Sequence, residues 1–533
     1  MIDRKVMLLA EQGDARAQFV LGLDYYEGND VAKDMVKAVK WFRMAAERGD
    51  AMAQRSLGLC YYKGEGVTKD LSEAVKWFRM AAKQGFAVAQ LNLGVCYANG
   101  YGVEKDEEEA VKWYRKAAEL GEPTAQFYLG GCYSQGKGVR KDIFTSTMWY
   151  REAAWRGLVK AQHVLGCCYK DGIGVEKNPV EAVTWYLKAA EQGVVESQHN
   201  LGMLYFMGQG VVQDMVMAVK WFRMAAEQGD VKAQYYLGRC YANGDGIPED
   251  VVEAAKWFRL AAEHGHVDAQ YCLGGCYENG DGVVKDMSKA AKWWRMAAEQ
   301  GHDDAQHNLG VCYTNGIGVA KDFAEAVKWF RMAAEQGDAG AQVNLGMRYA
   351  RGEGVTADMA EAVKLFRMAA EQGHVDAQFY MGESYEKGVG VKKDKRKAAK
   401  WYRMAAEQGH ADAQFYIGEC YEFGTCVKKN ILKAIKWYRM AAEQGHAKSQ
   451  TAMAVRYARG EGVVKDEAES LKWYRMAAEN GDDTAQFVLG FCYHKGKGVE
   501  KDEKEAVKWY RKAAAQGNSN AEMMLDSISE EPM

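Results

Sequence analysis

Four residues that could bind a metal ion lie close together near the middle of the chain. His264, His266, Cys272 and Cys276 fall within thirteen residues, and imidazole nitrogen and thiolate sulfur are ligands that zinc prefers. However, a histidine recurs at the place of His266 in later segments, at His302, His374, His410 and His446. Cys276 also stands at a position that is repeatedly cysteine. Recurring positions indicate a role in the fold, so we predict no metal site and no cofactor.

Two further matches point to phosphate binding and to acyl transfer. Residues 131–137 fit a phosphate-binding loop up to Lys137, but Gly138 stands where that motif has Ser or Thr, and no strand precedes it. Ser134 and Lys137 have the Ser-x-x-Lys spacing of penicillin-interacting enzymes without the companion motifs. No His–Asp–Ser or Cys–His arrangement stands out. We therefore predict that the protein is not an enzyme.

A repeat that fills the chain positions all of these residues. A glutamine, usually preceded by alanine, occurs every 36 residues from Gln18 to Gln486, fourteen times and without insertion or deletion. Within each unit, apolar residues recur at helical spacing. The length alone would suggest about three or four separate domains, but this regularity predicts one continuous array of repeats instead.

Each 36-residue unit predicts two helices. In the second unit the first helix would run from Asp50 to Gly64, and a Gly-x-Gly-Val turn follows it. Asp70 is placed to cap the second helix, with Glu73 at the spacing that completes a capping box. Gly85 is placed as the C-terminal glycine cap of that helix. Fourteen such units predict an all-α solenoid.

The repeated pattern identifies a family. Ala-Gln-x-x-Leu-Gly-x-x-Tyr-x-x-Gly-x-Gly-Val, then Asp, then Ala-Val-Lys-Trp-Phe/Tyr-Arg-x-Ala-Ala-Glu-Gln-Gly resembles the Sel1-like repeat, which is related to tetratricopeptide repeats. The resemblance covers essentially residues 11–525. It implies a right-handed α/α superhelical solenoid of 14 helical hairpins with a 36-residue period, whose concave groove serves as an adaptor or scaffold for protein complexes. Residues 14–517 would form the fourteen repeats, with half-repeat caps at 1–13 and at 518–533, the latter ending in a short tail.

One branch of that family is rich in cysteine and has a disulfide in each repeat. Its two cysteines would sit where this chain has, for example, Ala46 and Gln54, and neither position is cysteine in any repeat. The resemblance therefore gives no support to an exported protein stapled by disulfides. A β-lactam hydrolase, as proposed for that branch, stays as the less favoured alternative from another functional class.

Composition argues against several classes of partner. The chain has 70 Lys and Arg against 73 Asp and Glu, a formal net charge of −3, which removes a global electrostatic case for nucleic acid or an anionic membrane. No stretch approaches the roughly 18 to 20 apolar residues of a membrane helix, and the charged start of the chain is unlike a signal peptide. With twelve cysteines interpreted as reduced thiols, we predict a cytoplasmic protein, and secretion without a signal peptide stays open.

Departures from the repeat indicate where a partner would bind. The residues one, two, five, eight and nine after each glutamine vary most and share one face of the first helix, which by the family's architecture lines the groove. The aromatic side chains on this face are Phe127, Tyr128, Tyr235, Tyr236, Tyr271, Phe379, Tyr380, Phe415 and Tyr416. For the rings two residues after the glutamine, packing between hairpins is an equally supported interpretation.

Repeats 10 to 13 depart furthest and add charge. Their arginines on the variable helix are Arg348, Arg351, Arg456 and Arg459. The repeats between them contribute the glutamates Glu383, Glu386, Glu419 and Glu422. The 36-residue period would place these charges side by side along the groove. We interpret them as a pocket for a peptide or helix, with salt bridges between repeats as the alternative.

A block of basic residues stands beside these departures. It comprises Lys392, Lys393, Lys395, Arg396, Lys397 and Lys400. Like charges at a helix start are usually a solvated surface, and we interpret the block in that way. Steering of a charged partner or head-to-tail self-association is the alternative.

These observations together predict a non-enzymatic scaffold or adaptor. It would bind a peptide or helical segment of partner proteins along the groove, using aromatic anchors and pairing of Arg with Glu. A host-directed effector or signalling regulator that uses the same groove is the alternative within this class.

Overall fold

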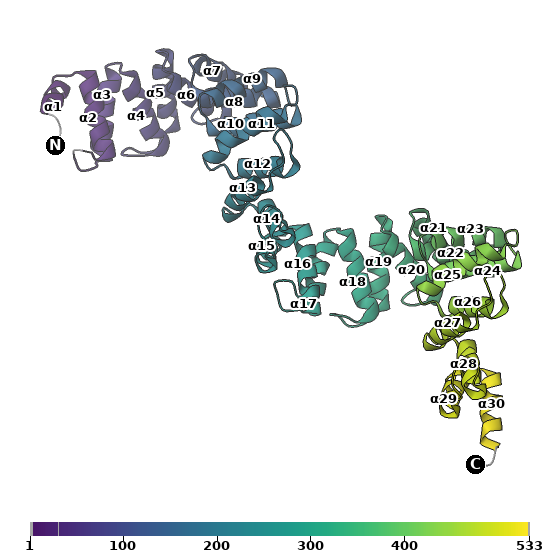
Figure 1. The fold of residues 1–533 in the computed structure, drawn as a ribbon. Helices are drawn as coiled ribbons and strands as arrows, with labels where there is room; N and C mark the ends of the chain where they lie inside the picture. The colour runs from purple at the N-terminus through teal and green to yellow at the C-terminus, as the bar shows by residue number, and fades with distance from the viewer. Residues whose placement is uncertain (1–3, 30, 531–533) are drawn as a thin grey trace. The chain divides into compact units, whose positions relative to one another are not determined.

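The computed structural model describes residues 4–29 and 31–530 (Figure 1). These residues form thirty α-helices and no strand, which confirms the all-α class. The fold divides into two compact units, Met1–His266 and Val267–Met533, and in each unit successive helices pack as hairpins. Within the described ranges, no helix combines the length and the apolar character that crossing a membrane requires.

Fifteen helices lie in the first unit. They are α1 (Arg4–Glu11), α2 (Ala15–Glu27), α3 (Met35–Glu47), α4 (Ala51–Lys63), α5 (Leu71–Lys83), α6 (Ala87–Asn99), α7 (Glu107–Glu119), α8 (Pro123–Gln135), α9 (Ile143–Trp155), α10 (Val159–Asp171), α11 (Pro179–Glu191), α12 (Val195–Met207), α13 (Met215–Glu227), α14 (Val231–Asn243) and α15 (Val251–Glu263).

The other fifteen lie in the second unit. They are α16 (Val267–Asn279), α17 (Met287–Glu299), α18 (Asp303–Asn315), α19 (Phe323–Glu335), α20 (Ala339–Arg351), α21 (Met359–Glu371), α22 (Val375–Lys387), α23 (Lys395–Glu407), α24 (Ala411–Phe423), α25 (Ile431–Glu443), α26 (Ala447–Arg459), α27 (Glu467–Glu479), α28 (Asp483–Lys495), α29 (Glu503–Ala514) and α30 (Ser519–Glu530).

The even-numbered helices from α2 to α28 are the first helices of the fourteen hairpins, and the odd-numbered helices that follow them are the second. Helices α1 and α30 fall in the segments predicted as half-repeat caps, and their capping role stays a prediction. Residues 1–3 and 531–533 of those predicted caps lie outside the described residues.

The hairpin of α4 and α5 shows how the repeat begins and ends its helices. The Asp50 carboxylate accepts from the Ala53 amide at 2.7 Å, and the Asp70 carboxylate accepts from the Glu73 amide at 3.0 Å. Both side chains satisfy amides that the first turn of a helix leaves unpaired. Gly64 ends α4 with a φ of 78°, and Gly85 follows α5 with a φ of 85°. These predicted boundaries are confirmed.

The predicted capping box is wrong in its second half. The Asp70 amide donates to the backbone oxygen of Tyr61 at 3.0 Å, so this amide has no need of the Glu73 carboxylate. Glu73 forms an ion pair with Lys76 one turn further along α5. The glutamates at the same place elsewhere also pair with a lysine three residues later, as in Glu109–Lys112, Glu325–Lys328, Glu361–Lys364 and Glu505–Lys508.

Glycines let the helices approach closely. A Cβ added to Gly58 on α4 would lie 2.6 Å from the Phe78 ring of α5. A Cβ on Gly66 in the turn would lie 2.1 Å from the backbone oxygen of Met35, at the start of α3. Both distances are far inside van der Waals contact, so any other residue would push neighbouring helices apart. The high glycine content therefore follows from the packing of the hairpins.

The repeated glutamine joins successive hairpins. Gln54 is buried, and its side-chain amide donates to the Ala46 backbone oxygen near the end of α3 at 3.1 Å. The acceptor is one of the last carbonyls of α3, which also accepts from the Gly49 amide at 3.0 Å. This contact explains why glutamine, a residue usually found at the surface, occupies a core position in every repeat.

Candidate partner-binding surface

The predicted rings one residue after the glutamine stack on histidines of the next hairpin. The ring centroids of Phe379 and His410 are 4.4 Å apart with an angle of 13° between the planes. Comparable stacks join Tyr235 to His266 and Tyr271 to His302, and the rings of Phe415 and His446 lie 5.1 Å apart at a tilt of 44°. Phe127 packs instead on Tyr150 of its own hairpin, 5.4 Å away. These rings are half-buried, so part of each ring packs within the fold and part faces solvent.

The predicted rings two residues after the glutamine pack against the preceding hairpin. Tyr416 of α24 lies on Tyr402 of α23 with centroids 4.0 Å apart. The same arrangement joins Tyr128 to Tyr114, Tyr236 to Phe222 and Tyr380 to Phe366. The interpretation that these rings pack between hairpins is therefore confirmed. Tyr128 is the most exposed of these four rings, with 43% of its surface accessible to solvent.

The predicted row of Arg and Glu pairs forms only in part. Arg456 of α26 is buried and forms ion pairs with Glu422 of the preceding hairpin and with Glu461 in its own turn. Arg348 of α20 is also buried, but it pairs with Glu353 of its own repeat at 2.5 Å. No ion pair joins Arg348 to the glutamates of the next repeat, because the turn of its own repeat brings a carboxylate closer.

The remaining arginines and three of the glutamates lie nearer the surface. Arg351 and Arg459 are exposed at the ends of α20 and α26. The hydroxyl groups of Tyr402 and Tyr438 donate to Glu386 at 2.8 Å and to Glu422 at 2.6 Å. Glu383 pairs with Lys387 one turn along α22, also at 2.5 Å. These carboxylates are thus held by neighbouring side chains.

Glu419 differs from the other three glutamates. Its side chain is half-buried on α24, and the described residues provide it with no hydrogen bond or ion pair. Burial raises the pKa of Glu419, the nearby Glu422 and Glu386 raise it further, and Lys448 lowers it. A half-buried carboxylate that forms no ion pair is costly. A cationic group from outside the chain would be stabilised here.

An open pocket brings part of the predicted site together. Its volume is about 340 Å³. The lining residues are Phe379, Glu383, Tyr402, Asp412, Phe415, Tyr416, His446, Ala447 and Lys448. Four of these, Phe379, Glu383, Phe415 and Tyr416, belong to the predicted site, and the predicted residues of the first unit lie elsewhere. Asp412, His446 and Lys448 were missed, because they lie at helix starts and not on the variable face.

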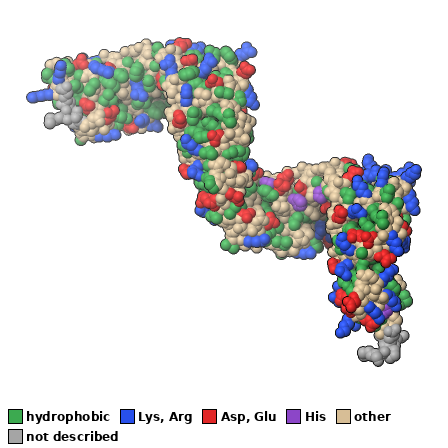
Figure 2. Space-filling model, in the orientation of Figure 1, with side chains coloured by type: hydrophobic (Ala, Val, Ile, Leu, Met, Phe, Trp, Pro, Cys, Tyr) green, Lys and Arg blue, Asp and Glu red, His purple; other side chains and the backbone are tan. Residues whose placement is uncertain are grey.

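The basic block lies at the start of α23. All six of its Lys and Arg side chains are exposed, and Figure 2 shows blue side chains gathered where Figure 1 places α23. The prediction of a solvated helix start is confirmed. The same exposure leaves the block available to a charged partner.

The structure gives other roles to the residues considered as zinc ligands. The Nδ1 atom of His264 lies 2.8 Å from the Leu260 backbone oxygen at the end of α15. His266 takes part in the stack on Tyr235, and Cys276 is buried in α16. Similarly, the Ser134 hydroxyl donates to the Gly131 backbone oxygen at 2.9 Å, an intrahelical contact.

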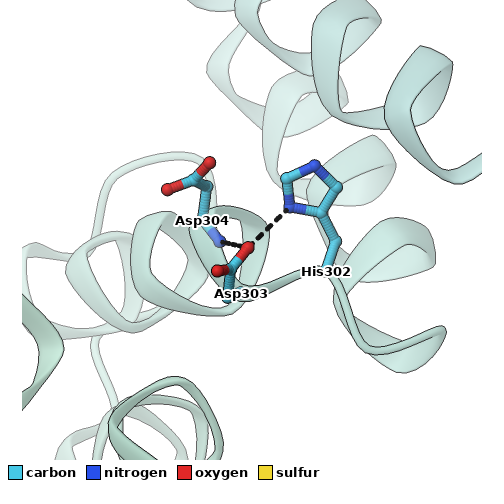
Figure 3. A group of neighbouring side chains, drawn as sticks. All are labelled: His302, Asp303 and Asp304. Carbon is cyan, nitrogen blue, oxygen red and sulfur yellow. Dashed lines mark hydrogen bonds and ion pairs between the residues drawn. The ribbon is translucent and has the colours of Figure 1, made fainter. Parts of the chain in front are cut away.

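Among the described residues, a different group has side-chain atoms close enough together to hold a metal ion. Figure 3 shows His302, Asp303 and Asp304 at the start of α18. The Ala305 amide donates to Nδ1 of His302 at 3.4 Å, so the lone pair that a metal would need is already shared. The positive end of the helix dipole lies at the same point and disfavours a cation. The arrangement is a helix cap.

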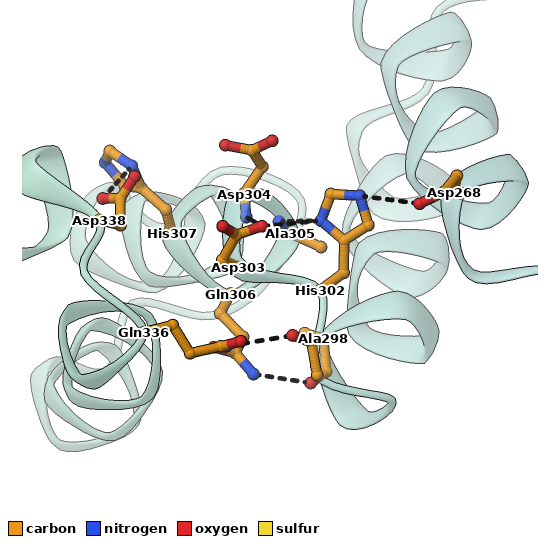
Figure 4. A network of polar contacts seen from close by, with 11 residues as sticks. Asp268, Ala298, His302, Asp303, Asp304, Ala305, Gln306, His307, Gln336 and Asp338 are labelled. Carbon is orange, nitrogen blue, oxygen red and sulfur yellow. Dashed lines mark hydrogen bonds and ion pairs between the residues drawn. The ribbon is translucent and has the colours of Figure 1, made fainter.

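Figure 4 places this cap in the contacts between hairpins. Nε2 of His302 lies 3.7 Å from the Asp268 carboxylate of α16. Nδ1 of His307 lies 3.1 Å from the Asp338 carboxylate at the start of α20. Gln306 donates to the Ala298 backbone oxygen at 3.0 Å. Histidine and aspartate thus link the first helices of neighbouring repeats.

The expectation that no Cys–His arrangement stands out is wrong. On α10, Nε2 of His163 lies 3.7 Å from the sulfur of Cys167. The two residues are four positions apart, which places them on one helix face. That spacing, together with two departures from the repeat in one helix, is a signal that could have been found in the sequence.

A family model described as Sel1 repeat matches the chain fourteen times. The matched segments are 15–50, 51–86, 87–122, 123–157, 159–194, 195–230, 231–266, 267–302, 303–338, 339–374, 375–410, 411–446, 447–482 and 484–518. They cover nearly all of the chain and coincide with the hairpins of the structure.

Solved structures include similar proteins. The crystal structure of c5321, described as a protective antigen present in uropathogenic Escherichia coli strains displaying an SLR fold, has a TM-score of 0.70 and 36% identity, and covers 91% of this chain and 97% of that one. A Sel1 repeat protein from Oxalobacter formigenes is 38% identical over 58% of this chain and 89% of that one, with a TM-score of 0.45.

The secretory immunoglobulin A-binding protein EsiB of Escherichia coli is 50% identical over 36 residues, which span only 7% of its length and 7% of this chain.

Proposed function

Because this chain belongs to the Sel1 repeat family, whose solenoid proteins generally mediate protein–protein interaction, we propose that it is a non-enzymatic scaffold for partner proteins. A peptide or helical segment of the partner would bind at the surface formed by repeats 11 and 12. The family is typically non-enzymatic, and the two candidate reaction motifs lie in structural positions.

The half-buried Glu419 beside an aromatic pocket is the observation that carries this proposal. The pocket offers the half-buried rings of Phe379, Phe415 and Tyr416, together with the carboxylates of Glu383 and Asp412. Aromatic rings bind apolar and cationic side chains well. Lys448 lowers the pKa of Glu419 but forms no ion pair with it, so a partner Lys or Arg in direct contact would offset the cost of burying the carboxylate.

In this proposal the two buried arginines hold glutamates of the chain itself and do not act as anchors for the partner. Arg456 holds Glu422 and Arg348 holds Glu353, so neither guanidinium is available as an anchor without breaking an ion pair. Arg351 and Arg459 are exposed and would contact acidic residues of a partner at the edges of the surface. The aromatic residues Phe127, Tyr128, Tyr235 and Tyr236 of the first unit and Tyr271 of the second would offer further contacts, each within its own unit.

Selection from a displayed peptide library tests this proposal. We expect the intact chain to enrich peptides that combine a Lys or Arg with an aromatic or large apolar residue. The Glu383→Lys, Glu419→Lys double variant should lose this enrichment. A matched control reverses Glu371 and Glu407, which are exposed at the ends of the second helices of the same region. Selected peptides without basic residues would contradict the proposal.

A host-directed role is the second candidate, and the comparisons favour it. The relative that matches 91% of this chain at 36% identity is described as a protective antigen of uropathogenic Escherichia coli, and a shorter match is to a protein named for binding secretory immunoglobulin A. We propose secretory immunoglobulin A as the ligand to test first, by biolayer interferometry with immunoglobulin G as the control. Equal signals from both would argue against this role.

The two candidates also differ in location. A housekeeping scaffold would act in the cytoplasm, whereas a host-directed protein must reach the cell surface or the medium. Fractionation of the native cells, followed by detection with an antibody to the chain, separates these possibilities. Recovery of the protein only with cytoplasmic markers would favour the scaffold.

A further inference from the structure

Helix α10 carries a cysteine whose sulfur two polar side chains contact, and a third side chain contacts one of these two. Nε2 of His163 lies 3.7 Å from the sulfur of Cys167, and the Tyr186 hydroxyl of α11 donates to the same sulfur at 3.2 Å. Nδ1 of His163 lies 2.8 Å from the Ser197 hydroxyl of α12. Three consecutive helices of the first unit thus contribute to one cluster around a thiol.

The buried serine orients the imidazole. Ser197 has no exposed surface, and its contact with Nδ1 directs Nε2 of His163 toward the sulfur. A nucleophile, a base in contact with it and a third group that orients the base form the general arrangement of an activated nucleophile. Helix α10 therefore holds Cys167 and His163 in a geometry suited to proton transfer.

Both contacts to the sulfur favour its ionised form. Burial raises the pKa of Cys167, but the hydrogen bonds with His163 and Tyr186 outweigh it and bring the pKa below its usual value. The contact with Cys167 raises the pKa of His163, although burial lowers it. Of the neighbouring charges, Lys170 lowers both pKa values and Glu196 of α12 raises that of His163. The two contacts thus shift the pair toward the thiolate and the imidazolium.

Equivalent positions in other repeats lack this combination. His199 and His307 occupy the place of His163, but their Nδ1 atoms contact carboxylates of the next hairpin. Met203 and Val311 stand where the fifth repeat has Cys167. By contrast, burial raises the pKa of the half-buried Cys132. The fifth repeat thus differs at these positions from the two other repeats that have a histidine there.

We propose that Cys167 is a nucleophilic cysteine, activated by His163, and a site of modification by hydroperoxides and other small electrophiles. Cys167 is only half-buried, and it lies five residues after the glutamine, on the variable face of the first helix. Part of Cys167 is therefore exposed in the folded hairpin, although the residue also packs against a buried apolar cluster. The inference does not depend on the proposed binding surface, which lies in the other unit.

Cys167 and His163 supply the thiolate and the proton that the reaction with hydrogen peroxide requires. The thiolate attacks one peroxide oxygen, so a sulfur–oxygen bond forms while the oxygen–oxygen bond breaks. Sulfur is oxidised by two electrons to sulfenic acid, and the peroxide is reduced. The leaving hydroxide takes a proton from the His163 imidazolium and departs as water.

Site-resolved alkylation of the intact chain tests the proposal. The chain is treated briefly with iodoacetamide at pH 7, and each cysteine is quantified by peptide mass spectrometry. An ordinary thiol with a pKa of about 8.5 is only about 3% ionised at this pH. We expect Cys167 to react at least about tenfold faster than Cys132, the half-buried internal control. The alkylation rate of Cys167 should also reach its plateau at a lower pH than the rate of Cys132.

Two variants separate activation by His163 from simple exposure. His163→Gln should slow alkylation of Cys167 toward the rate of Cys132, whereas His199→Gln, at the same place in the next repeat, should leave it unchanged. After peroxide treatment, dimedone should label Cys167 first. Equal rates at the two thiols, no effect of His163→Gln in a chain with unchanged circular dichroism, or equal dimedone labelling of Cys132 would each overturn the proposal.

Discussion

The side-chain amide of Gln84 donates to the side-chain oxygen of Gln54 at 2.8 Å, across one hairpin. Ten of the fourteen hairpins have this contact between residues 30 positions apart. In four others the second residue is Arg48, Leu120, Arg156 or His264. The buried oxygens of Gln18, Gln90, Gln126 and Gln234 then have no partner among the described residues. A buried acceptor without a donor costs stability.

The first prediction concerns one of these four hairpins. Leu120→Gln would supply the missing donor to Gln90, and Leu120 is 59% exposed, so little apolar burial is lost. We expect the free energy of unfolding to rise by about 0.5 to 1.5 kcal/mol, as measured by urea denaturation. The reverse change, Gln84→Leu, should lower it by a similar amount. A destabilised Leu120→Gln variant would show that the paired glutamines do not stabilise the hairpin.

The second prediction concerns the buried ion pair of repeats 12 and 13. Arg456→Met leaves Glu422 without its cation, and breaking a buried pair costs about 3 to 5 kcal/mol. Arg459→Met removes an exposed arginine of the same helix and should change stability by only about 0.5 kcal/mol. Thermal unfolding followed by circular dichroism compares the two variants. Similar melting temperatures would show that Arg456 has no structural role.

The third prediction concerns pH. Nδ1 of His446 accepts from the Ser449 amide at 3.2 Å, and burial lowers the pKa of His446 although Asp412 opposes this. The unfolded chain therefore binds a proton more readily than the folded one. The contribution of this cap is complete above the unfolded pKa of about 6.5 and decreases as the pH falls below it.

Asparagine, which caps a helix without titrating, isolates that contribution. The free energy of unfolding of the intact chain should fall more steeply between pH 7 and pH 5 than that of His446→Asn. His374 also precedes a helix but makes no side-chain capping hydrogen bond, so His374→Asn is the matched control and should follow the intact chain. Parallel pH profiles for His446→Asn and the intact chain would contradict the prediction.

The sequence predicted the hairpins because each boundary depends on residues close together in the chain. Asp50, Gly64 and Gly85 specify helix ends locally, and the spacing of Gln54 specifies the period. The capping box failed at Glu73, because the Tyr61 carbonyl, from the preceding helix, takes the amide that this carboxylate would have bound.

The candidate site was less predictable because its contacts join different helices. Predicting the ring contact between Phe415 and His446 requires knowing which residues of neighbouring hairpins lie opposite each other. Arg348 could pair with a glutamate of the next repeat or of its own turn, and only the structure decides between them. The group around Cys167 draws Tyr186 and Ser197 from two further helices, so spacing along α10 alone does not reveal it.

The central claim is that repeats 11 and 12 bind a basic segment of a partner. Isothermal titration of a selected peptide with the intact chain and with the Glu383→Lys, Glu419→Lys variant tests it most directly. We predict a loss of affinity of at least tenfold, about 1.4 kcal/mol, while the Glu371→Lys, Glu407→Lys control retains the original Kd. Equal affinity for the intact chain and the first variant, with both folded by circular dichroism, would contradict the claim.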